Sequence, residues 1–318
     1  MPYVASEGLI GFGKESTWGQ VADAETFVEV VSERLAASNA LVAPEGAAGT
    51  KMRKRLLQGV RRIEGELDML PTPEALGQAL VMLFGEPVTT ELTDGVYQHV
   101  FQGEPGEAIS ASIEVNLGGF KSRQIVGCKA ETLRLGFPQR NVLDLTLGVV
   151  GKQESLIEPS SFELAGSEPL SFVGGSAEFP IGTACGDVSG GEIVIYRGLV
   201  RDWATLGSGT EIAKLPEGKR TTSLRVALDF ENTTAYEAFL DAEWKSLKVA
   251  FAGEEIATGY NAALVIEAPK LRIESPGLHL HGPDGLLVQE LICEAVVDCS
   301  LATPTDVKVT LVNTTESY

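Results

Sequence analysis

The chain has 318 residues, of which 44% are hydrophobic and 22% charged, so it can form packed cores. Its length favours two domains, although a single large β domain of this size is possible. Its 25 lysine and arginine residues stand against 44 acidic ones, and the net charge of −19 disfavours nucleic-acid binding because such a field repels phosphates. No apolar run is long enough to span a bilayer and no signal peptide is recognisable, so we expect assembly in a cytoplasm and no membrane partner.

Two strands separated by a loop are the first predicted elements. Residues 28–35 have strand character, and residues 63–69 place apolar or small side chains at every second position, the period of a half-buried strand. The alternate positions of the second strand form a solvated face with Glu64, Glu66 and Asp68. The loop between the strands, residues 36–59, contains a basic cluster with Lys51, Arg53, Lys54 and Arg55.

A helix follows the second strand. Thr72 can cap its N-terminus, Pro73 suits the first helical position, and Gly85 can end it. Its apolar residues share one face, which predicts a helix packed on the sheet; they are Leu76, Ala79, Leu80 and Leu83.

A long hairpin comes next, with its turn at Gly118 and Gly119. Its first strand alternates between two kinds of side chain. One side is apolar and contains Ile109, Ala111, Ile113 and Val115. The other side is polar and contains Ser110, Ser112, Glu114 and Asn116. The returning strand, residues 120–126, includes Ile125.

The second half of the chain repeats this order of elements without obvious sequence identity. Residues 192–199 match residues 28–35 at an offset of 164, residues 224–230 match 63–69 at 161, and residues 271–273 match 133–135 at 138. A second helix is predicted, with its buried stripe formed by Tyr236, Phe239 and Leu240. We therefore expect a mainly β (α+β) fold with two tandem β-sandwich or barrel domains, each with one packed helix, divided as 1–152, an irregular linker 153–190, and 191–318.

Motifs for catalysis or cofactor binding are weak. Gly11 and Gly13 lack the third glycine of a dinucleotide loop, and neither a phosphate-binding loop nor a nucleophile elbow occurs. His279 and His281 could share one face of an extended segment, but a third metal ligand is not evident. We expect a protein that is not an enzyme and that needs no metal or cofactor.

Three segments resemble one known family. Residues 11–19 open with a glycine, a Lys-Glu pair, a hydroxyl residue, an aromatic residue and a second glycine. Residues 60–85 combine a strand, a turn and a Leu-rich helix that ends in Phe-Gly, and residues 122–135 place Gly127-Cys128-Lys129 before a strand. Together these segments resemble the tail tube proteins of long-tailed, siphovirus-type phages, whose short members have only one such domain.

The resemblance implies a structural virion protein that forms stacked rings around a hollow conduit for DNA ejection. A chain with the unit in tandem would need three copies for a ring with pseudo-sixfold symmetry. Its implied partners are further copies of itself, the tape-measure and other tail proteins, and double-stranded DNA that passes without specific binding. The implied location is the virion tail tube after assembly in the host cytoplasm.

Three groups of residues are candidates for these contacts. The polar side of the hairpin, Ser110, Ser112, Glu114 and Asn116, is the candidate lining of the lumen, although the opposite side could face inward instead. The candidates for β-edge contacts between subunits are Ile109, Ile113, Val115 and Ile125. The candidates for ring stacking are Lys51, Arg53, Lys54 and Arg55.

Two alternatives remain open. One is another tail component, such as a tail terminator or a sheath-like protein, which would form a single ring or none. The other is a ligand-binding β-sandwich module, although aromatic residues make up only 7% of the chain and are scattered.

Overall fold

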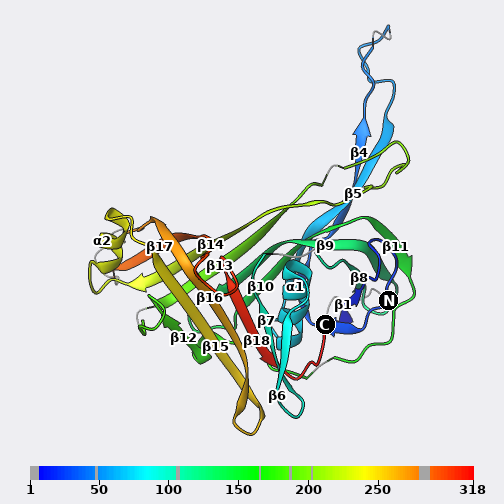
Figure 1. The fold of residues 1–318 in the computed structure, drawn as a ribbon. Coiled ribbons are helices and arrows are strands. Elements are labelled where there is room, and N and C mark those ends of the chain that lie inside the picture. Colours follow the sequence, from blue (N-terminus) through cyan, green and yellow to red (C-terminus); the bar gives the residue numbers. More distant parts are fainter. Residues whose placement is uncertain are drawn as a thin grey trace.

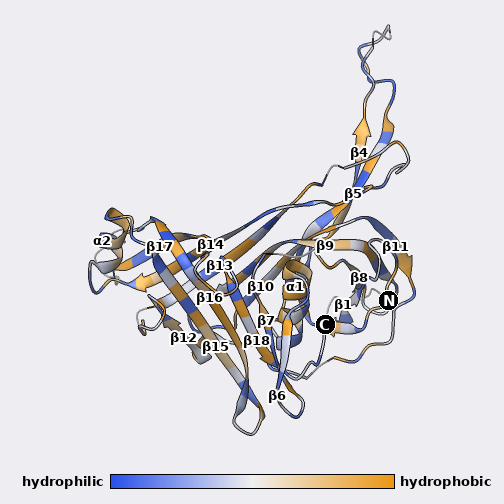
Figure 2. Ribbon diagram, in the orientation of Figure 1, coloured by the Kyte–Doolittle hydropathy of each residue, from blue (hydrophilic) through white to orange (hydrophobic). Residues whose placement is uncertain are grey.

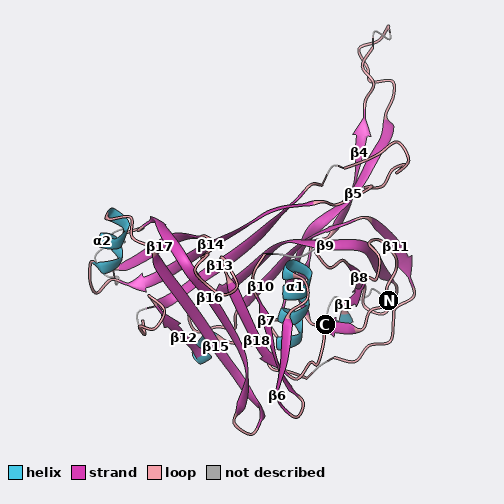
Figure 3. Ribbon diagram, viewed as in Figure 1, coloured by secondary structure: helices cyan, strands magenta, loops and turns pink. Residues whose placement is uncertain are grey.

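The computed structural model describes residues 7–46, 49–104, 108–164, 166–185, 188–201, 203–278 and 287–318. The described chain consists mostly of antiparallel strands with two α-helices, which confirms the mainly β prediction (Figure 3). Neither helix is long and apolar enough to cross a membrane.

The first half of the chain contributes two packed sheets. One contains, in spatial order, β3 (Val30–Glu33) with β4 (Ala36–Val42), then β5 (Leu57–Met69), β10 (Asp144–Gly151) and the C-terminal part of β9 (Ser122–Phe137). The other contains β2 (Thr26–Val28), β1 (Leu9–Lys14), β8 (Ala111–Asn116), the N-terminal part of β9, and β11 (Gln153–Ile157). The long strand β9 therefore runs through both sheets.

The second half contains strands paired in the same order. Its first sheet has β13 (Val188–Leu199), β14 (Glu217–Asp229), β17 (Val288–Ala295) and the C-terminal part of β16 (Tyr260–Ser275). Its second has β12 (Gly175–Glu178), β15 (Lys245–Ala257), the N-terminal part of β16, and β18 (Lys308–Asn313). The segment predicted as a linker holds β11, the 3-10 turn Phe172–Gly174 and β12.

Strand pairing joins the two halves directly (Figure 1). The C-terminal part of β9 pairs with β13, so the first sheets of both halves form one continuous sheet. The first half also contributes a hairpin of β6 (Val88–Thr93) and β7 (Val96–Phe101), and β7 pairs with β18. One hydrophobic core extends through both halves. The division into separate domains stays a prediction.

Helix α1 (Pro73–Phe84) forms as its sequence predicts. The Thr72 hydroxyl accepts a hydrogen bond from the Ala75 amide at 3.3 Å, Pro73 begins the helix, and Gly85 ends it in a conformation with φ of 92°. Nearly every residue of α1 is buried because β9 of the first half and β16 and β18 of the second half all pack on it.

Helix α2 (Thr234–Leu240) differs from its prediction. It buries only Ala235 and Ala238, whereas Tyr236 is 36% and Leu240 63% exposed. The predicted buried stripe is therefore wrong for these two residues. The physical reason is that α2 lies at the far end of the molecule in Figure 1, where β16 is its main packing neighbour among the described elements.

The C-terminal residues contact both α1 and the β7–β18 pair. The Tyr318 ring occupies the space over Gly77, where a Cβ atom would lie within 2 Å of it. It meets the ring of His99 edge-on at 5.0 Å. The fully buried His99 donates from Nε2 to the Asn313 side chain (3.1 Å) and the Thr315 carbonyl (2.9 Å), while Nδ1 accepts from the Thr89 hydroxyl (2.9 Å). Burial lowers the pKa of His99 below its ordinary 6.5 and outweighs these bonds.

The lowered pKa predicts an acid sensitivity that the His99→Gln variant loses. As pH falls below about 6.5, the unfolded chain takes up a proton at His99 while the folded chain does not, so wild-type stability declines down to the lowered pKa of the folded state. Urea unfolding of both proteins between pH 8 and pH 5 measures this. The other two histidines are common to both proteins, so they do not cause a difference. Identical pH dependence of stability in the two proteins would contradict a lowered pKa of His99.

Candidate assembly surfaces

The predicted lumen residues, which lie in β8 or directly before it, are buried inside the subunit. Ser110 and Ser112 donate to the Glu15 carboxylate at 2.8 and 2.9 Å, and the amides of Gly19 and Gly127 donate to it at 2.7 Å each. Glu15 itself is only 8% exposed. This one carboxylate therefore fixes the N-terminal segment across the polar side of the hairpin.

The other two lumen candidates also have partners within the chain. Glu114, 2% exposed, accepts from the Ser160 amide and hydroxyl at 2.9 and 2.6 Å. Asn116 accepts from the Gly119 amide at 2.9 Å and shapes the hairpin turn. Their role in a lumen stays a prediction. Both side chains are buried within the subunit, so neither is exposed to a channel in this conformation.

The predicted edge residues lie in or against the core. Ile113, Val115 and Ile125 are at most 5% exposed, and Ile109 packs against the core from a partly buried position. Strand β8 pairs with β1 on one side and with β9 on the other, so both of its sides are occupied within the chain. The strands with one described neighbouring strand are elsewhere: β2, β3, β4, β6, β11 and β12.

The continuous sheet has a polar outward face, which we call the acidic sheet face. It comprises the outward side chains of β5, β10, β9, β13, β14, β17 and β16. On these strands acidic side chains outnumber basic ones: Glu64, Glu66, Asp68, Asp144, Glu192, Asp229, Glu274, Glu290 and Glu294 against Arg62, Arg134, Lys219, Arg225, Lys270 and Arg272. Two arginines outside these strands also pair with acids of this face: Arg34 with Glu66 and Asp68, and Arg201 with Glu64. The opposite face of each strand is buried in the core.

Local contacts set the charge on this face. Arg134 lies 3.3 Å from Glu192 across the β9–β13 pair, and both are partly exposed. Burial opposes ionisation of Asp68, but hydrogen bonds from Ser32 and Thr146 and nearby arginines lower its pKa overall. Partial burial, and next the charge of Glu274, raise the pKa of Glu294. Burial is the larger of the two causes, because it disfavours the charged form of the carboxyl group.

The hairpin of β4 and β5 projects away from the body (Figure 1). Its loop presents the predicted stacking residues Lys51, Arg53, Lys54 and Arg55, all exposed. Apolar side chains accompany them, and Figure 2 shows β4 as largely hydrophobic; the most exposed are Leu41, Val42, Met52, Leu56 and Leu57, each more than half exposed. An exposed apolar hairpin of this kind is typical of a contact surface. Its base is supported by the 200–216 loop, where the Arg61 amide donates to the Thr210 carbonyl at 2.7 Å.

A buried charge cluster lies where the halves meet, and no sequence pattern indicated it. Arg197 of β13 is 1% exposed, pairs with Glu217, and donates to the Leu83 carbonyl at the end of α1 at 2.6 Å. Glu217 also accepts from Lys129 of β9 at 2.9 Å. Burial, and next the charge of Arg220, lower the pKa of Arg197 to about 10, so it remains a cation at neutral pH. Removing one member would leave a buried charge without its partner, so the cluster favours one arrangement of the halves.

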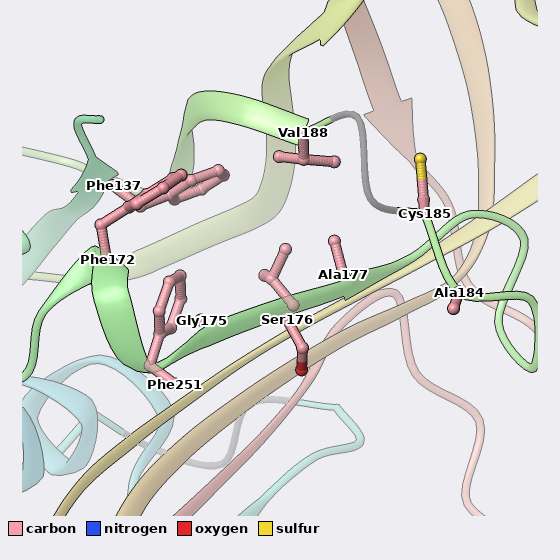
Figure 4. A pocket seen from close by; sticks show the side chains of 10 residues that line it. Phe137, Phe172, Gly175, Ser176, Ala177, Ala184, Cys185, Val188 and Phe251 are labelled. Atoms are coloured by element: carbon pink, nitrogen blue, oxygen red, sulfur yellow. The ribbon is translucent and has the colours of Figure 1, made fainter. Parts of the chain in front are cut away.

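An apolar cavity of about 360 Å³ lies between β12, β15 and the start of β13. The rings of Phe137, Phe172 and Phe251 line it together with small residues, and Figure 4 shows the rings gathered at one end. Among the described residues no group of three or more His, Cys, Asp or Glu side chains could hold a metal. His279 and His281 lie outside the described residues.

We expect Glu15→Ala to lower the free energy of unfolding by roughly 3 kcal/mol, because it leaves two buried hydroxyls and two amides without a charged acceptor. Chemical denaturation measures the change. Glu45→Ala, at an exposed loop carboxylate, is the matched control and should stay within about 0.5 kcal/mol of wild type. Equal stabilities of the two variants would contradict the anchoring role of Glu15.

Comparison with known proteins identifies one family. The chain matches the family described as phage tail tube protein over residues 5–285, which is most of its length. No curated protein matches it. Since the match covers far more than half of the chain, this protein belongs to the phage tail tube protein family.

Proposed function

We propose that this protein is the repeating subunit of a tail tube, in which three copies close into a ring with pseudo-sixfold symmetry and rings stack into a conduit for DNA. The observation that carries the proposal is the continuous sheet, with one face buried in the core and the other exposed and acidic. The shared order of strands in the two halves supports the pseudo-sixfold symmetry, because each half then supplies one similar unit.

The acidic sheet face is the better candidate for the lumen. A wall that neutralises phosphates would retain DNA, whereas an acidic wall lets it pass without binding. The hairpin residues Ser110, Ser112, Glu114 and Asn116 carry less support for this role because they are buried. The same lumen would enclose the tape-measure protein before DNA enters, and other tail proteins would bind the ends of the tube.

The projecting β4–β5 hairpin is the candidate for ring stacking. Its basic residues would meet acidic surface on the next ring, since the subunit carries a net charge of −19. Its exposed apolar residues would be covered in the same contact. This combination favours a stacked tube over the alternative of a single terminator ring.

Negative-stain microscopy of the purified protein tests the proposal. Long hollow tubes of stacked rings are the expected result. Single rings that do not stack would favour a terminator. Persistent monomers that are stabilised by small apolar ligands would favour a binding module, for which the Phe-lined cavity would be the site.

Charge reversal on the lumen face should slow DNA ejection while tubes still form. We expect Glu290→Lys with Glu294→Lys to slow ejection from virions on the order of tenfold, because added cations bind phosphates. The control is Glu91→Lys with Glu163→Lys, at two exposed sites off this face. Ejection at the wild-type rate from tubes of normal length would remove the acidic sheet face as the lumen.

Neutralising the stacking loop should weaken contact between rings. In the variant with glutamine at positions 53, 54 and 55, tubes should dissociate more readily at low salt and respond less to added salt than wild-type tubes, because salt screens the charges that the variant lacks. Arg140→Gln with Lys214→Gln, at exposed sites outside this loop and off the acidic sheet face, is the control. Salt-dependent disassembly identical to wild type would exclude the electrostatic role.

A further inference from the structure

Three features of the contact between the two halves of one chain lie at the β9–β13 junction. Residues 132–137 of β9 pair with residues 191–196 of β13. Arg134 and Glu192 form an ion pair across this junction on the acidic sheet face. On the buried face, Leu76 and Leu80 of α1 lie among core residues from both halves, including Leu135 and Ile193.

The far end of the second half has corresponding elements, but the strand there has a described partner along only one of its two edges. Strands β9 and β16 both have 16 residues, and an offset of 138 places Arg272 and Ile273 where β9 has Arg134 and Leu135. The pairing of β15 with β16 ends at Leu271, so among the described strands Arg272–Ser275 pairs only with β17. This short edge corresponds to the part of β9 that pairs with β13.

Helix α2 also lacks the covering that α1 has. Leu240 is 63%, Trp244 47% and Tyr236 36% exposed, so apolar surface gathers on and directly after this helix. Arg272 stacks on the Trp244 ring at 4.1 Å, which places the exposed aromatic residue beside the open edge of β16. In the first half, the equivalent surface is buried by the second half.

The opposite end of the continuous sheet offers the matching edge. Strands β3 and β4 pair only with β5 among the described strands, and they occupy the place in the first half that β13 has in the second. Val31 is 67% exposed on β3, and the carboxylate of Glu29 is exposed directly before it. Glu29 could meet Arg272 as Glu192 meets Arg134.

We infer that the contact between subunits repeats the contact between the halves of one chain. A second copy places its β3–β4 edge along Arg272–Ser275 of the first, continues the sheet, and covers Tyr236, Leu240 and Trp244 with its first half. This contact is head-to-tail, so each copy uses a different surface toward each neighbour and rotation can close the ring. The inference rests on the proposed ring, and it names the two surfaces that make it.

Two variants test the inference, each with lysines introduced into one of the two contact surfaces. One carries Tyr236→Lys and Leu240→Lys on the α2 side, and the other carries Glu29→Lys and Val31→Lys on the β3 side. All four side chains are at least a third exposed in the subunit, so both variants should fold. The control carries Val88→Lys and Val173→Lys, at exposed valines on other elements.

Sedimentation velocity of wild type, the control and both variants measures the result. Wild type and control should form rings, and each variant alone should stay monomeric. An equimolar mixture of the two variants should give a dimer and nothing larger, since one intact pair of surfaces remains. Rings formed by either variant as readily as by wild type would overturn the inferred contact while leaving the proposed function intact. A wild type and control that form no rings would overturn the proposed ring and, with it, this contact.

Discussion

The pairing of β9 with β13 is the constraint on which the rest of the structure depends. Without it each half would leave a sheet edge and a helix face open to water, and both are costly in a small β unit. With it, α1 is buried between strands of both halves, and the C-terminal Tyr318 can close over Gly77. The buried Arg197–Glu217 pair lies at the same place, so polar as well as apolar contacts depend on this junction.

Glu15 has a comparable role in the first half. A carboxylate that accepts four hydrogen bonds in a nearly dry site is stable only when all its donors are in place. It therefore holds β1 against β8 and converts the long hairpin from an open edge into part of the core. Because β1 occupies this edge of β8, the candidate assembly edges lie instead at the ends of the continuous sheet.

The two halves are alike in strand order and unlike in what covers them. The first half carries the projecting basic hairpin, the β6–β7 insertion and a buried helix. The second half has a helix whose apolar residues remain exposed. The exposed surface of α2 corresponds to the surface of α1 that the second half of the chain buries. That asymmetry is what a head-to-tail assembly requires.

The local features of this protein were determined by its sequence. Alternation in residues 63–69 places Ile63, Leu67 and Met69 in the core, and Thr72, Pro73 and Gly85 set the limits of α1, because each of these signals acts within a few residues. The basic loop and the hairpin turn at Gly118 and Gly119 are equally local.

Only the tertiary structure decided which surfaces are exposed. The polar side of β8 has the pattern of a solvated face, yet it is buried because Glu15, distant in sequence, binds it. The apolar stripe of α2 has the pattern of a packed helix, yet Leu240 is exposed because β16 is the main described strand that packs on this helix. Periodicity specifies which side chains share a face. The burial of that face depends on segments that are distant in sequence, as Glu15 is from Ser110.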